Sequence, residues 1–320
     1  MPVDLQVQQI LDQGRLLPAM ETLSVDAARK RCIEAFCTNG VPEYVNQIQN
    51  RIIDIPINHT IQKVGIRIYT PKAPAPLPIL LYFHGGGFVL NNLDTHDAIC
   101  RNLANSGECI VISVDYARAP ESQYPLALEQ CWQASLWVVK NAARIGGDPL
   151  RIAVGGDSSG GTLAAAITLI ARDFKALNIC FQLLLYPALD YYLPGTISYQ
   201  KFSTGYSLTR QIMIWFFSKY LPAGFDRDDP YLFPARTKSH ENLPPALIIT
   251  AEYDPLRDEA EHYAKLLEKA GVSVTLKRYH GMIHGFIIMH HAIDIGKTAL
   301  TYAGAVLKKQ FISYKKNRII

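Results

Sequence analysis

The chain has 320 residues, of which 49% are hydrophobic and 19% are charged, and its formal net charge is +4. This composition is typical of a globular protein with a large core and excludes the disordered and collagen-like classes. The basic residues are scattered, so we predict no nucleic-acid-binding face. The one basic cluster, at 308–309 and 315–318, is expected to be a solvated helix end and tail.

The start of the chain contains acidic residues and no apolar segment, so we predict no secretory signal. The longest apolar runs, such as "FQLLLYPAL" at 181–189, are too short to cross a bilayer. We therefore expect a cytoplasmic protein without a membrane partner. The cysteines form no C-x-x-C pair and no Cys/His pattern, so we expect buried thiols, with neither disulfides nor a metal site.

The first part of the chain predicts helices followed by a hairpin. Residues 1–45 carry an amphipathic helical pattern. The β-like runs 51–57 and 64–70 are separated by a short polar turn that includes residues 58–59, which is the pattern of a β-hairpin.

After a proline-rich loop, apolar strands alternate with helices. We predict strands at 79–83, 109–116, 151–156, 181–187, 245–254 and 272–280. We predict helices near 95–106, 125–145, 159–173, 256–270 and 291–309. Continuous apolar strands are covered on both faces, and their alternation with helices implies right-handed crossovers. The fold class is therefore α/β, with a mostly parallel sheet.

One long insertion interrupts this alternation. About sixty residues separate Tyr186 from Pro245, where a crossover is usually short. The insertion contains an aromatic-rich helix at 207–222, "SLTRQIMIWFFSKYLP". We predict that it caps the end of the sheet, and the alternative is a helix that packs on the flank of the sheet.

The stretch "VGGDSSGGTLAAA" at 154–166 follows a predicted strand and opens a predicted helix. Gly156 to Gly160 reads G-x-S-x-G, and this context is that of a nucleophile elbow with Ser158 exposed at its tip. A phosphate-binding loop is disfavoured, because Gly161 stands where that motif requires lysine. A purely structural turn stays open.

A serine needs a base to accept its proton, and in α/β-hydrolases the chain order is serine, acid, histidine. Asp254 and His284 each follow a predicted strand in that order, so we predict that Asp254 orients His284 and that His284 moves the proton. The rival positions are Glu252, Asp258, His280, His290 and His291. Asp157, beside the serine, is expected to brace the turn.

A second constellation, "YFHGGGFVL" at 82–90, follows another strand. Acyl transfer needs N–H donors where the carbonyl oxygen becomes negative. We predict that the amides of Gly85, Gly86 and Ser159 supply them and that His84 anchors the loop by hydrogen bonding. The side chains expected to line an apolar, water-excluding substrate pocket are Phe88, Trp215, Phe216 and Phe217.

Five blocks resemble the hormone-sensitive-lipase-like family of bacterial carboxylesterases. They are "HGGGF", "VDYARAPESQYPLALEQCW", "GGDSSGGTLAAA", "AEYDPLRDEAEHYAKLLEKAGV" and "YHGMIHGF", and they cover most of residues 79–288. The resemblance implies an α/β-hydrolase core of about eight strands with a helical cap, no cofactor, and hydrolysis of short-to-medium acyl esters. It places the nucleophile, the acid, the base and the oxyanion donors on the residues named above.

The chain departs from the family pattern at two places. Ser159 stands where alanine is commoner, which leaves the backbone amide unchanged but can alter local hydrogen bonds. "YARAPE" stands where "YRLAPE" is commoner, and Glu121 of this block is expected to brace the elbow from beneath.

We therefore expect a serine carboxylesterase that uses Ser158, Asp254 and His284 on a small-molecule ester, without metal or cofactor. Amide or N-acetyl hydrolysis on the same triad is an alternative. A non-catalytic receptor of this fold is disfavoured, because such receptors lose the histidine. Interfacial lipase action is disfavoured, because the sequence contains no long apolar segment that would form an exposed flap. A homodimer is compatible with the sequence.

The expected organisation has four parts in chain order. They are the N-terminal helices contributing to a cap (1–45), the first part of the hydrolase core (46–188), the cap insertion (189–240) and the second part of the core (241–320).

Overall fold

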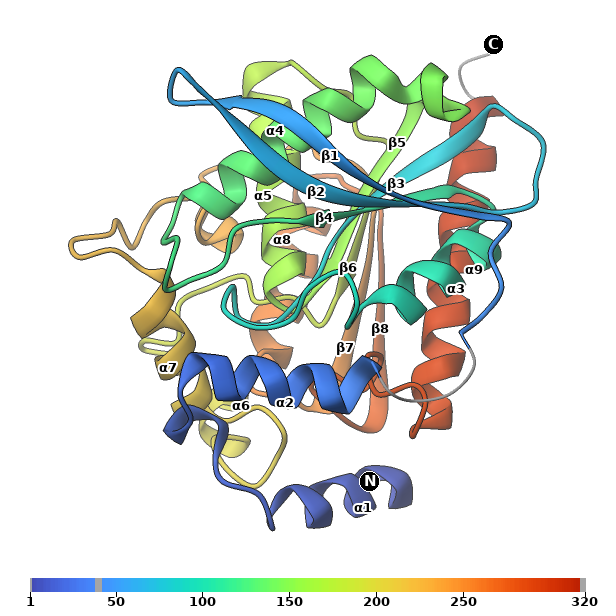
Figure 1. Ribbon diagram of the computed structural model, residues 1–320. Coiled ribbons are helices and arrows are strands. Elements are labelled where there is room, and N and C mark those ends of the chain that lie inside the picture. The colour runs from blue at the N-terminus through green and yellow to red at the C-terminus, as the bar shows by residue number, and fades with distance from the viewer. Residues whose placement is uncertain (1, 38–41, 317–320) are drawn as a thin grey trace.

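The computed structural model describes residues 2–37 and 42–316, and these form an eight-stranded sheet with helices on both faces (Figure 1). The end of the basic C-terminal cluster, residues 317–318, lies outside this range. The strand order is β1-β2-β4-β3-β5-β6-β7-β8. The strands are β1 (Gln47–Ile57), β2 (Thr60–Thr70), β3 (Leu77–Phe83), β4 (Ile110–Asp115), β5 (Gly147–Asp157), β6 (Phe181–Leu185), β7 (Ala246–Tyr253) and β8 (Val274–Ile283).

In the described part of the chain, the β1–β2 and β2–β4 pairs are antiparallel and the other neighbouring pairs are parallel. The predicted α/β class with a mostly parallel sheet of about eight strands is therefore confirmed. Each strand predicted between 79 and 280 is present, with boundaries that differ by a few residues.

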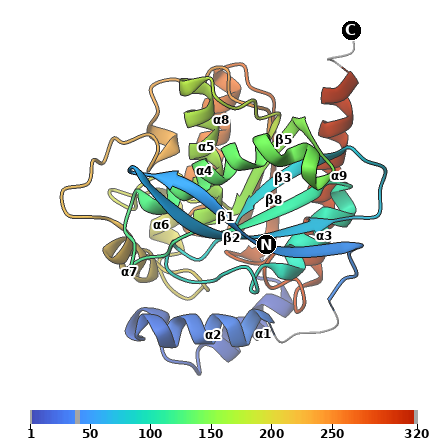
Figure 2. The same cartoon turned by 45° about the horizontal axis from the view of Figure 1, so that its top comes forward.

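The helices are α1 (Leu5–Gly14), α2 (Val25–Cys37), α3 (Asp97–Gly107), α4 (Leu126–Asn141), α5 (Ser159–Phe174), α6 (Ile197–Lys201), α7 (Arg210–Tyr220), α8 (Arg257–Lys269) and α9 (Asp294–Lys316). Short 3₁₀ turns lie at η1 (Met20–Thr22), η2 (Ala142–Ile145) and η3 (Pro234–Arg236). Helices α3 and α9 cover one face of the sheet, and α4, α5 and α8 cover the other (Figure 2).

Burial on both faces explains the continuous apolar strands. Every residue of β3 is buried, and β4 and β6 are buried nearly throughout. Two apolar clusters form the core, one against α4, α5 and α8 and one against α3 and α9. The cysteines carry free thiols, and all except Cys37 are buried.

The predicted hairpin is longer than its apolar runs. Strands β1 and β2 pair from Gln47 with Thr70 to Ile57 with Thr60. The added residues are mostly polar and none is buried, and they join the ladder through backbone hydrogen bonds that need no apolar side chain. Asn58 and His59 turn the chain with φ of 49° and 62°, the left-handed conformation that two-residue hairpin turns favour.

Helices α1, α2, α6 and α7 gather at one end of the sheet (Figure 1). Helix α7 begins after Thr209, whose hydroxyl accepts the amide of Ile212 at 3.1 Å, and it packs against η1. Two distant parts of the chain therefore lie over the same end of the core. Within the described residues, no helix combines the length and the apolar character that a bilayer span requires.

Candidate active site

The sharp turn between β5 and α5 places Ser158 at the end of the sheet. Ser158 has φ 52° and ψ −122°, a conformation that a non-glycine residue rarely adopts. A Cβ on Gly160 would overlap the carbonyl oxygen of Phe83, and one on Gly156 would lie 2.5 Å from that oxygen. Glycine is required at both positions because the turn presses directly against β3.

The three side chains predicted to form a triad are brought together by the fold. His284 Nε2 lies 2.9 Å from Ser158 Oγ, and His284 Nδ1 lies 2.7 Å from Asp254 Oδ2. Asp254 is completely buried, and its other oxygen accepts the amide of Leu256 at 2.9 Å. Ser158, Asp254 and His284 directly follow β5, β7 and β8, so one edge of a parallel sheet collects them.

The rival acids and histidines have other partners. Glu252 accepts hydrogen bonds from the amide of Gly281 at 2.8 Å and from His280, whose Nδ1 is 3.3 Å away. Asp258 accepts the amide of Ser198 at 2.8 Å, which links α8 to α6. His290 Nδ1 donates to a backbone carbonyl at 3.0 Å. Each of these rival side chains therefore forms these hydrogen bonds with groups other than Ser158 or His284.

His284 is supported by two residues that the sequence analysis missed. The Tyr186 ring meets the imidazole edge to face, with the ring centroids 4.9 Å apart. Ser207, in the insertion, donates its hydroxyl to the carbonyl of His284 at 2.8 Å. The sequence signal for Tyr186 was its place directly after β6, at the same edge of the sheet.

In the glycine loop after β3, one of the predicted donor amides is used inside the protein. The amide of Gly85 donates to Asp157 Oδ1 at 3.0 Å, so this N–H is already used inside the protein. Among the described residues, no acceptor receives the amides of Gly86, Gly87 or Ser159. Gly86 and Gly87, rather than Gly85, thus leave their amides without a protein acceptor in the described chain, because the direction of each amide depends on backbone angles that the three identical letters do not reveal.

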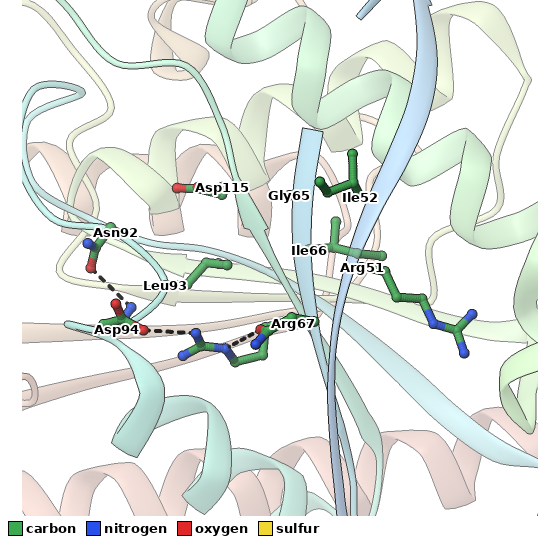
Figure 3. A pocket seen from close by; sticks show the side chains of 10 residues that line it. Arg51, Ile52, Gly65, Ile66, Arg67, Asn92, Leu93, Asp94 and Asp115 are labelled. Carbon is green, nitrogen blue, oxygen red and sulfur yellow. Dashed lines mark hydrogen bonds and ion pairs between the residues drawn. The ribbon is translucent and has the colours of Figure 1, made fainter. Parts of the chain in front are cut away.

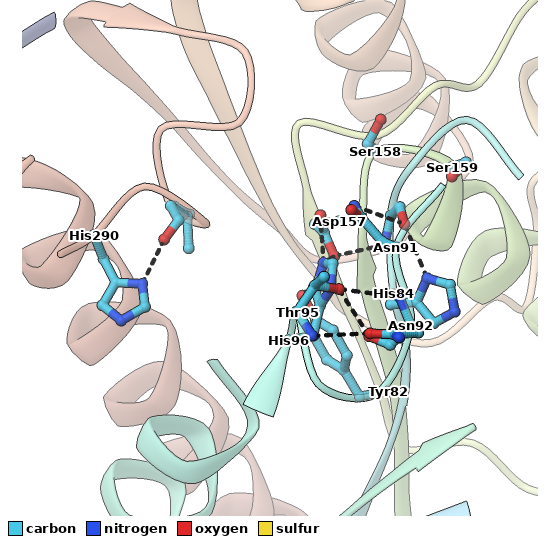
Figure 4. Close-up of polar contacts among 12 residues, drawn as sticks. Tyr82, His84, Asn91, Asn92, Thr95, His96, Asp157, Ser158, Ser159 and His290 are labelled. Carbon is cyan, nitrogen blue, oxygen red and sulfur yellow. Dashed lines mark hydrogen bonds and ion pairs between the residues drawn. The ribbon is translucent and has the colours of Figure 1, made fainter. Parts of the chain in front are cut away.

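Asp157 occupies the centre of a buried polar network beside Ser158 and Ser159 (Figure 4). Its carboxylate accepts hydrogen bonds from the Tyr82 hydroxyl at 2.9 Å, the Gly85 amide at 3.0 Å and His96 Nε2 at 3.2 Å. Burial raises the pKa of Asp157, but the charge of His96 and these hydrogen bonds outweigh burial, so this pKa lies below its ordinary value. Asp157 thus braces the turn as predicted, while Tyr82 and His96 were missed.

His84 anchors the loop, as the sequence suggested. Its Nδ1 lies 2.9 Å from the carbonyl oxygen of Gly85, and its ring stacks on Tyr116 with centroids 4.2 Å apart. Burial lowers the pKa of His84 to about 3, so the imidazole is neutral near pH 7. The ring therefore serves the structure of the loop.

Glu121 does not lie beneath the elbow, and that expectation was wrong. Its exposed carboxylate pairs with the Arg29 guanidinium at 2.6 and 2.7 Å, and these hydrogen bonds hold the pKa of Glu121 at about 2. Arg29 also donates to the carbonyls of Val89 and Ala119, each at 2.9 Å. The Arg29 side chain thus connects helix α2 to the end of the glycine loop. This contact joins residues that are far apart in the sequence, so the sequence alone could not indicate it.

Among the predicted pocket aromatics, Phe88 belongs to the glycine loop and Phe216 packs on it. The Phe216 ring packs so closely on Gly87 that a Cβ there would overlap it. Phe88 stacks on Tyr220 with centroids 3.8 Å apart and planes within 6°. Trp215 neighbours Phe216 at 5.4 Å. Helix α7 therefore places aromatic rings directly against the loop that follows β3.

An open cleft of about 430 Å³ lies elsewhere, over the antiparallel part of the sheet (Figure 3). It is lined by Asn50, Arg51, Ile52, Gly65, Ile66, Arg67, Asn92, Leu93, Asp94 and Asp115. Arg67 donates to Asp94 at 2.8 Å and to Asn50 at 2.7 Å, so its charge is already paired within the protein. None of the triad side chains faces this cleft, which separates it from the candidate site.

Comparisons with known proteins agree with this geometry. A family described as alpha/beta hydrolase fold matches residues 80–288. Esterase LipI of Mycobacterium tuberculosis is 41% identical over 244 residues, which are 74% of this chain and 75% of LipI. Ethyl acetate hydrolase of Pseudomonas putida is 35% identical over 289 residues, which are 88% of each chain.

The fold is equally close to solved structures. The crystal structure of a thermostable esterase from Pseudomonas putida superposes with a TM-score of 0.91 at 35% identity and covers 97% of this chain and 98% of that one. The family match, the sequence relatives and the superposition span the same core that carries Ser158, Asp254 and His284. The chain therefore belongs to the α/β-hydrolase family, in the hormone-sensitive-lipase-like group of esterases that its motifs resemble.

Proposed function

We propose that this protein is a serine carboxylesterase that hydrolyses short-to-medium acyl esters through an acyl-enzyme. The observation that carries the proposal is the continuous hydrogen-bonded chain from Asp254 through His284 to Ser158. A buried carboxylate, an imidazole and a hydroxyl in this order activate the hydroxyl as a nucleophile. The sequence relatives named as an esterase and as ethyl acetate hydrolase support this reaction class.

In the first half of the reaction, Ser158 Oγ forms a bond to the ester carbonyl carbon while His284 Nε2 takes the hydroxyl proton. The carbonyl π electrons move to the oxygen, which becomes an oxyanion. We assign its donors to the amides of Gly86, Gly87 and Ser159, which meet no protein acceptor among the described residues. Asp254 holds the imidazole in the required tautomer and stabilises its positive charge.

The oxyanion then collapses, the bond to the alcohol oxygen breaks, and His284 Nε2 gives its proton to the leaving alcohol. This leaves the acyl group on Ser158. In the second half, His284 removes a proton from water, whose oxygen attacks the acyl carbon. The same amides stabilise the second oxyanion, and its collapse returns the proton to Ser158 and releases the acid.

We also assign the cap to residues 1–45 and 189–240, on a core formed by 46–188 and 241–320. Support comes from α1, α2, α6 and α7, which gather at one end of the sheet (Figure 1), and from the place of Ser158 directly after the last residue of β5. The ring of Phe216 against Gly87 leaves little room beside the oxyanion donors. This crowding favours short acyl chains, because a long chain would have to displace a buried aromatic ring.

The test is a series of p-nitrophenyl esters from acetate to palmitate, assayed with the wild type and with Ser158→Ala. We expect turnover to be highest on short chains and to fall by about 10⁴-fold or more in Ser158→Ala. An organophosphate should inactivate the wild type and label Ser158, as mass spectrometry of the peptides would show. A p-nitroanilide series measures amide hydrolysis on the same triad. Retention of most activity by Ser158→Ala would contradict the proposal.

A further inference from the structure

The hydroxyl of Ser159 makes a contact that the reaction described above does not use. Ser159 is the first residue of α5 and is only 1% exposed. Its Oγ accepts the amide N–H of Phe88 at 3.2 Å. Phe88 follows Gly87 in the glycine loop, so this bond crosses from the nucleophile helix to the loop that carries the other oxyanion donors (Figure 4 shows Ser159 next to Ser158).

The loop needs such a restraint because its backbone is strained. Gly86, Gly87 and Phe88 have φ of 121°, 61° and 62°, so three successive residues adopt left-handed conformations. Glycine tolerates this, but Phe88 does so only where its surroundings hold it. The Phe88 carbonyl accepts the amide of Ala119 at 2.8 Å, and the ring stacks on Tyr220. The Ser159 hydroxyl holds the remaining polar group of Phe88, its N–H.

We propose that the side chain of Ser159 is a positioning group for the oxyanion site, and this inference rests on the proposed esterase function. The hydroxyl fixes the peptide plane between Gly87 and Phe88, and through it the direction of the Gly86 and Gly87 amides. The amide of Ser159 itself is assigned above as a donor to the same oxyanion. One residue therefore supplies an oxyanion donor from its backbone and sets the distance to the other donors with its side chain.

Removal of the Ser159 hydroxyl leaves the amide N–H of Phe88 without its acceptor. Within the described chain, the Phe88 amide has no acceptor other than Ser159 Oγ. A buried N–H without an acceptor is unfavourable, so the loop is expected to move until water or another oxygen satisfies it. Movement of the loop weakens hydrogen bonds to the transition state more than contacts with the bound ester, because oxyanion donors must match the developing charge.

The experiment compares Ser159→Ala with the matched control Ser135→Ala. Ser159→Ala keeps the backbone amide and removes only Oγ. Ser135 is an equally buried helical serine on α4, whose hydroxyl donates to the carbonyl of Cys131 at 2.8 Å. For each protein, kcat and KM are measured on p-nitrophenyl butyrate, together with the inhibition constant of a trifluoromethyl ketone, which forms an oxyanion on Ser158.

We expect Ser159→Ala to lower kcat by about five- to tenfold, the effect of one buried hydrogen bond, with KM changed less than about twofold. The inhibition constant of the ketone should rise by the same factor as the loss in kcat/KM. Hydrogen–deuterium exchange should become faster in peptides that cover residues 84–90. Ser159→Cys, which retains a weak acceptor, should recover part of kcat. Ser135→Ala should keep wild-type kcat, KM and inhibition.

Two results would overturn the inference. One is a Ser159→Ala protein with wild-type kcat and unchanged exchange in the loop. The other is an equal loss of kcat in Ser135→Ala, which would show that any buried hydroxyl deletion has this effect. Failure of the proposed function looks different, because then the wild type hydrolyses no acyl ester or Ser158→Ala stays active. Exchange at residues 84–90 would still report on the Ser159–Phe88 bond in that case.

Discussion

The carboxylate of Asp157 accepts the amide N–H of Gly85 at 3.0 Å, and this bond joins the nucleophile turn to the glycine loop. A second bond, from the Phe88 amide to Ser159 Oγ, joins the same two segments on the other side of Ser158. The residues that flank the nucleophile therefore hold both ends of the "GGG" stretch. Because both hydrogen bonds are buried, we expect the distance between the glycine loop and Ser158 to stay constant.

Asp157→Asn should destabilise the protein and lower its activity, with a distinct pH dependence. The pKa of Asp157 lies below its ordinary value, so the unfolded chain binds a proton at a higher pH than the folded one. Its stabilisation is thus present above a pH of about 4, the ordinary value, and is lost as the pH falls through the folded-state pKa. The free-energy difference between wild type and variant, about 3 kcal/mol near pH 7, should shrink in acid.

Urea unfolding at a series of pH values measures this difference. A difference that stays constant from pH 7 to pH 3 would show that the charge of Asp157 does not contribute. The kcat of Asp157→Asn at pH 7 should fall as well, because Asn retains one acceptor oxygen but places an amide group in the carboxylate site next to His96.

His84→Gln should remove an acid sensitivity that lies in a different pH window. Burial lowers the pKa of His84 from 6.5 to about 3, so below pH 6.5 the unfolded chain takes up a proton that the folded protein does not. Stability is therefore lost as the pH falls from 6.5 toward 3, by at most about 1.4 kcal/mol per pH unit. The variant should lose less stability over this range while its amide still bonds to the loop.

The free energy of unfolding of the wild type and of His84→Gln is measured by heat and by urea between pH 7.5 and 4, at steps of about half a pH unit. Parallel curves for the wild type and the variant would count against the buried neutral imidazole. The kcat of His84→Gln at pH 7 should stay close to that of the wild type, because His84 is not part of the proton-transfer chain.

Phe216→Ala should shift the acyl preference toward longer esters. The Phe216 ring packs on Gly87, and its removal opens space beside the glycine loop. We expect kcat/KM for p-nitrophenyl decanoate to rise relative to the acetate by about tenfold. Phe217→Ala is the matched control, because Phe217 lies on the same helix with similar burial but meets Tyr191 and Phe233. The same shift in both variants would point to a general loosening of the cap.

Arg29→Met should lower kcat although the side chain lies on the N-terminal helix α2. The guanidinium donates to Val89 and Ala119 in the loops beside the site and also binds Glu121. Its loss frees the far end of the glycine loop, and we expect kcat to fall about tenfold. The control Arg31→Met removes an arginine of the same helix that bonds Pro18, within the N-terminal segment.

Steady-state kinetics and melting temperatures of both arginine variants are the measurement. Arg31→Met should keep wild-type kcat even where its melting temperature falls. If Arg29→Met keeps wild-type kcat, the link between helix α2 and the loop has no bearing on turnover. Arg29→Lys should restore little, because a single ammonium cannot replace a guanidinium that binds two carbonyls and a carboxylate together.

The sequence was sufficient to predict the strands of the parallel part of the sheet, most of the helices and the three side chains that meet at its edge. Apolar runs of strand length are local signals, and they located every strand of the parallel part of the sheet. The G-x-S-x-G turn is also a local signal. The order serine, acid, histidine along the chain then selects Asp254 and His284 as the partners of Ser158. Because parallel strands end at one edge, residues that follow successive strands meet there without further information.

The groups that surround these three side chains could be found only from the packing of the folded chain. The Gly85 amide lies 72 residues from Asp157, the His96 ring 61 residues from it, and Arg29 lies 92 residues from Glu121. None of these pairs has a local signature, since each depends on how separate elements pack. The direction of an amide in "HGGG" also depends on φ and ψ, and identical glycines accept many values. Which amides of the loop lack an internal acceptor therefore follows from packing, while the position of Ser158 at the turn follows from pattern.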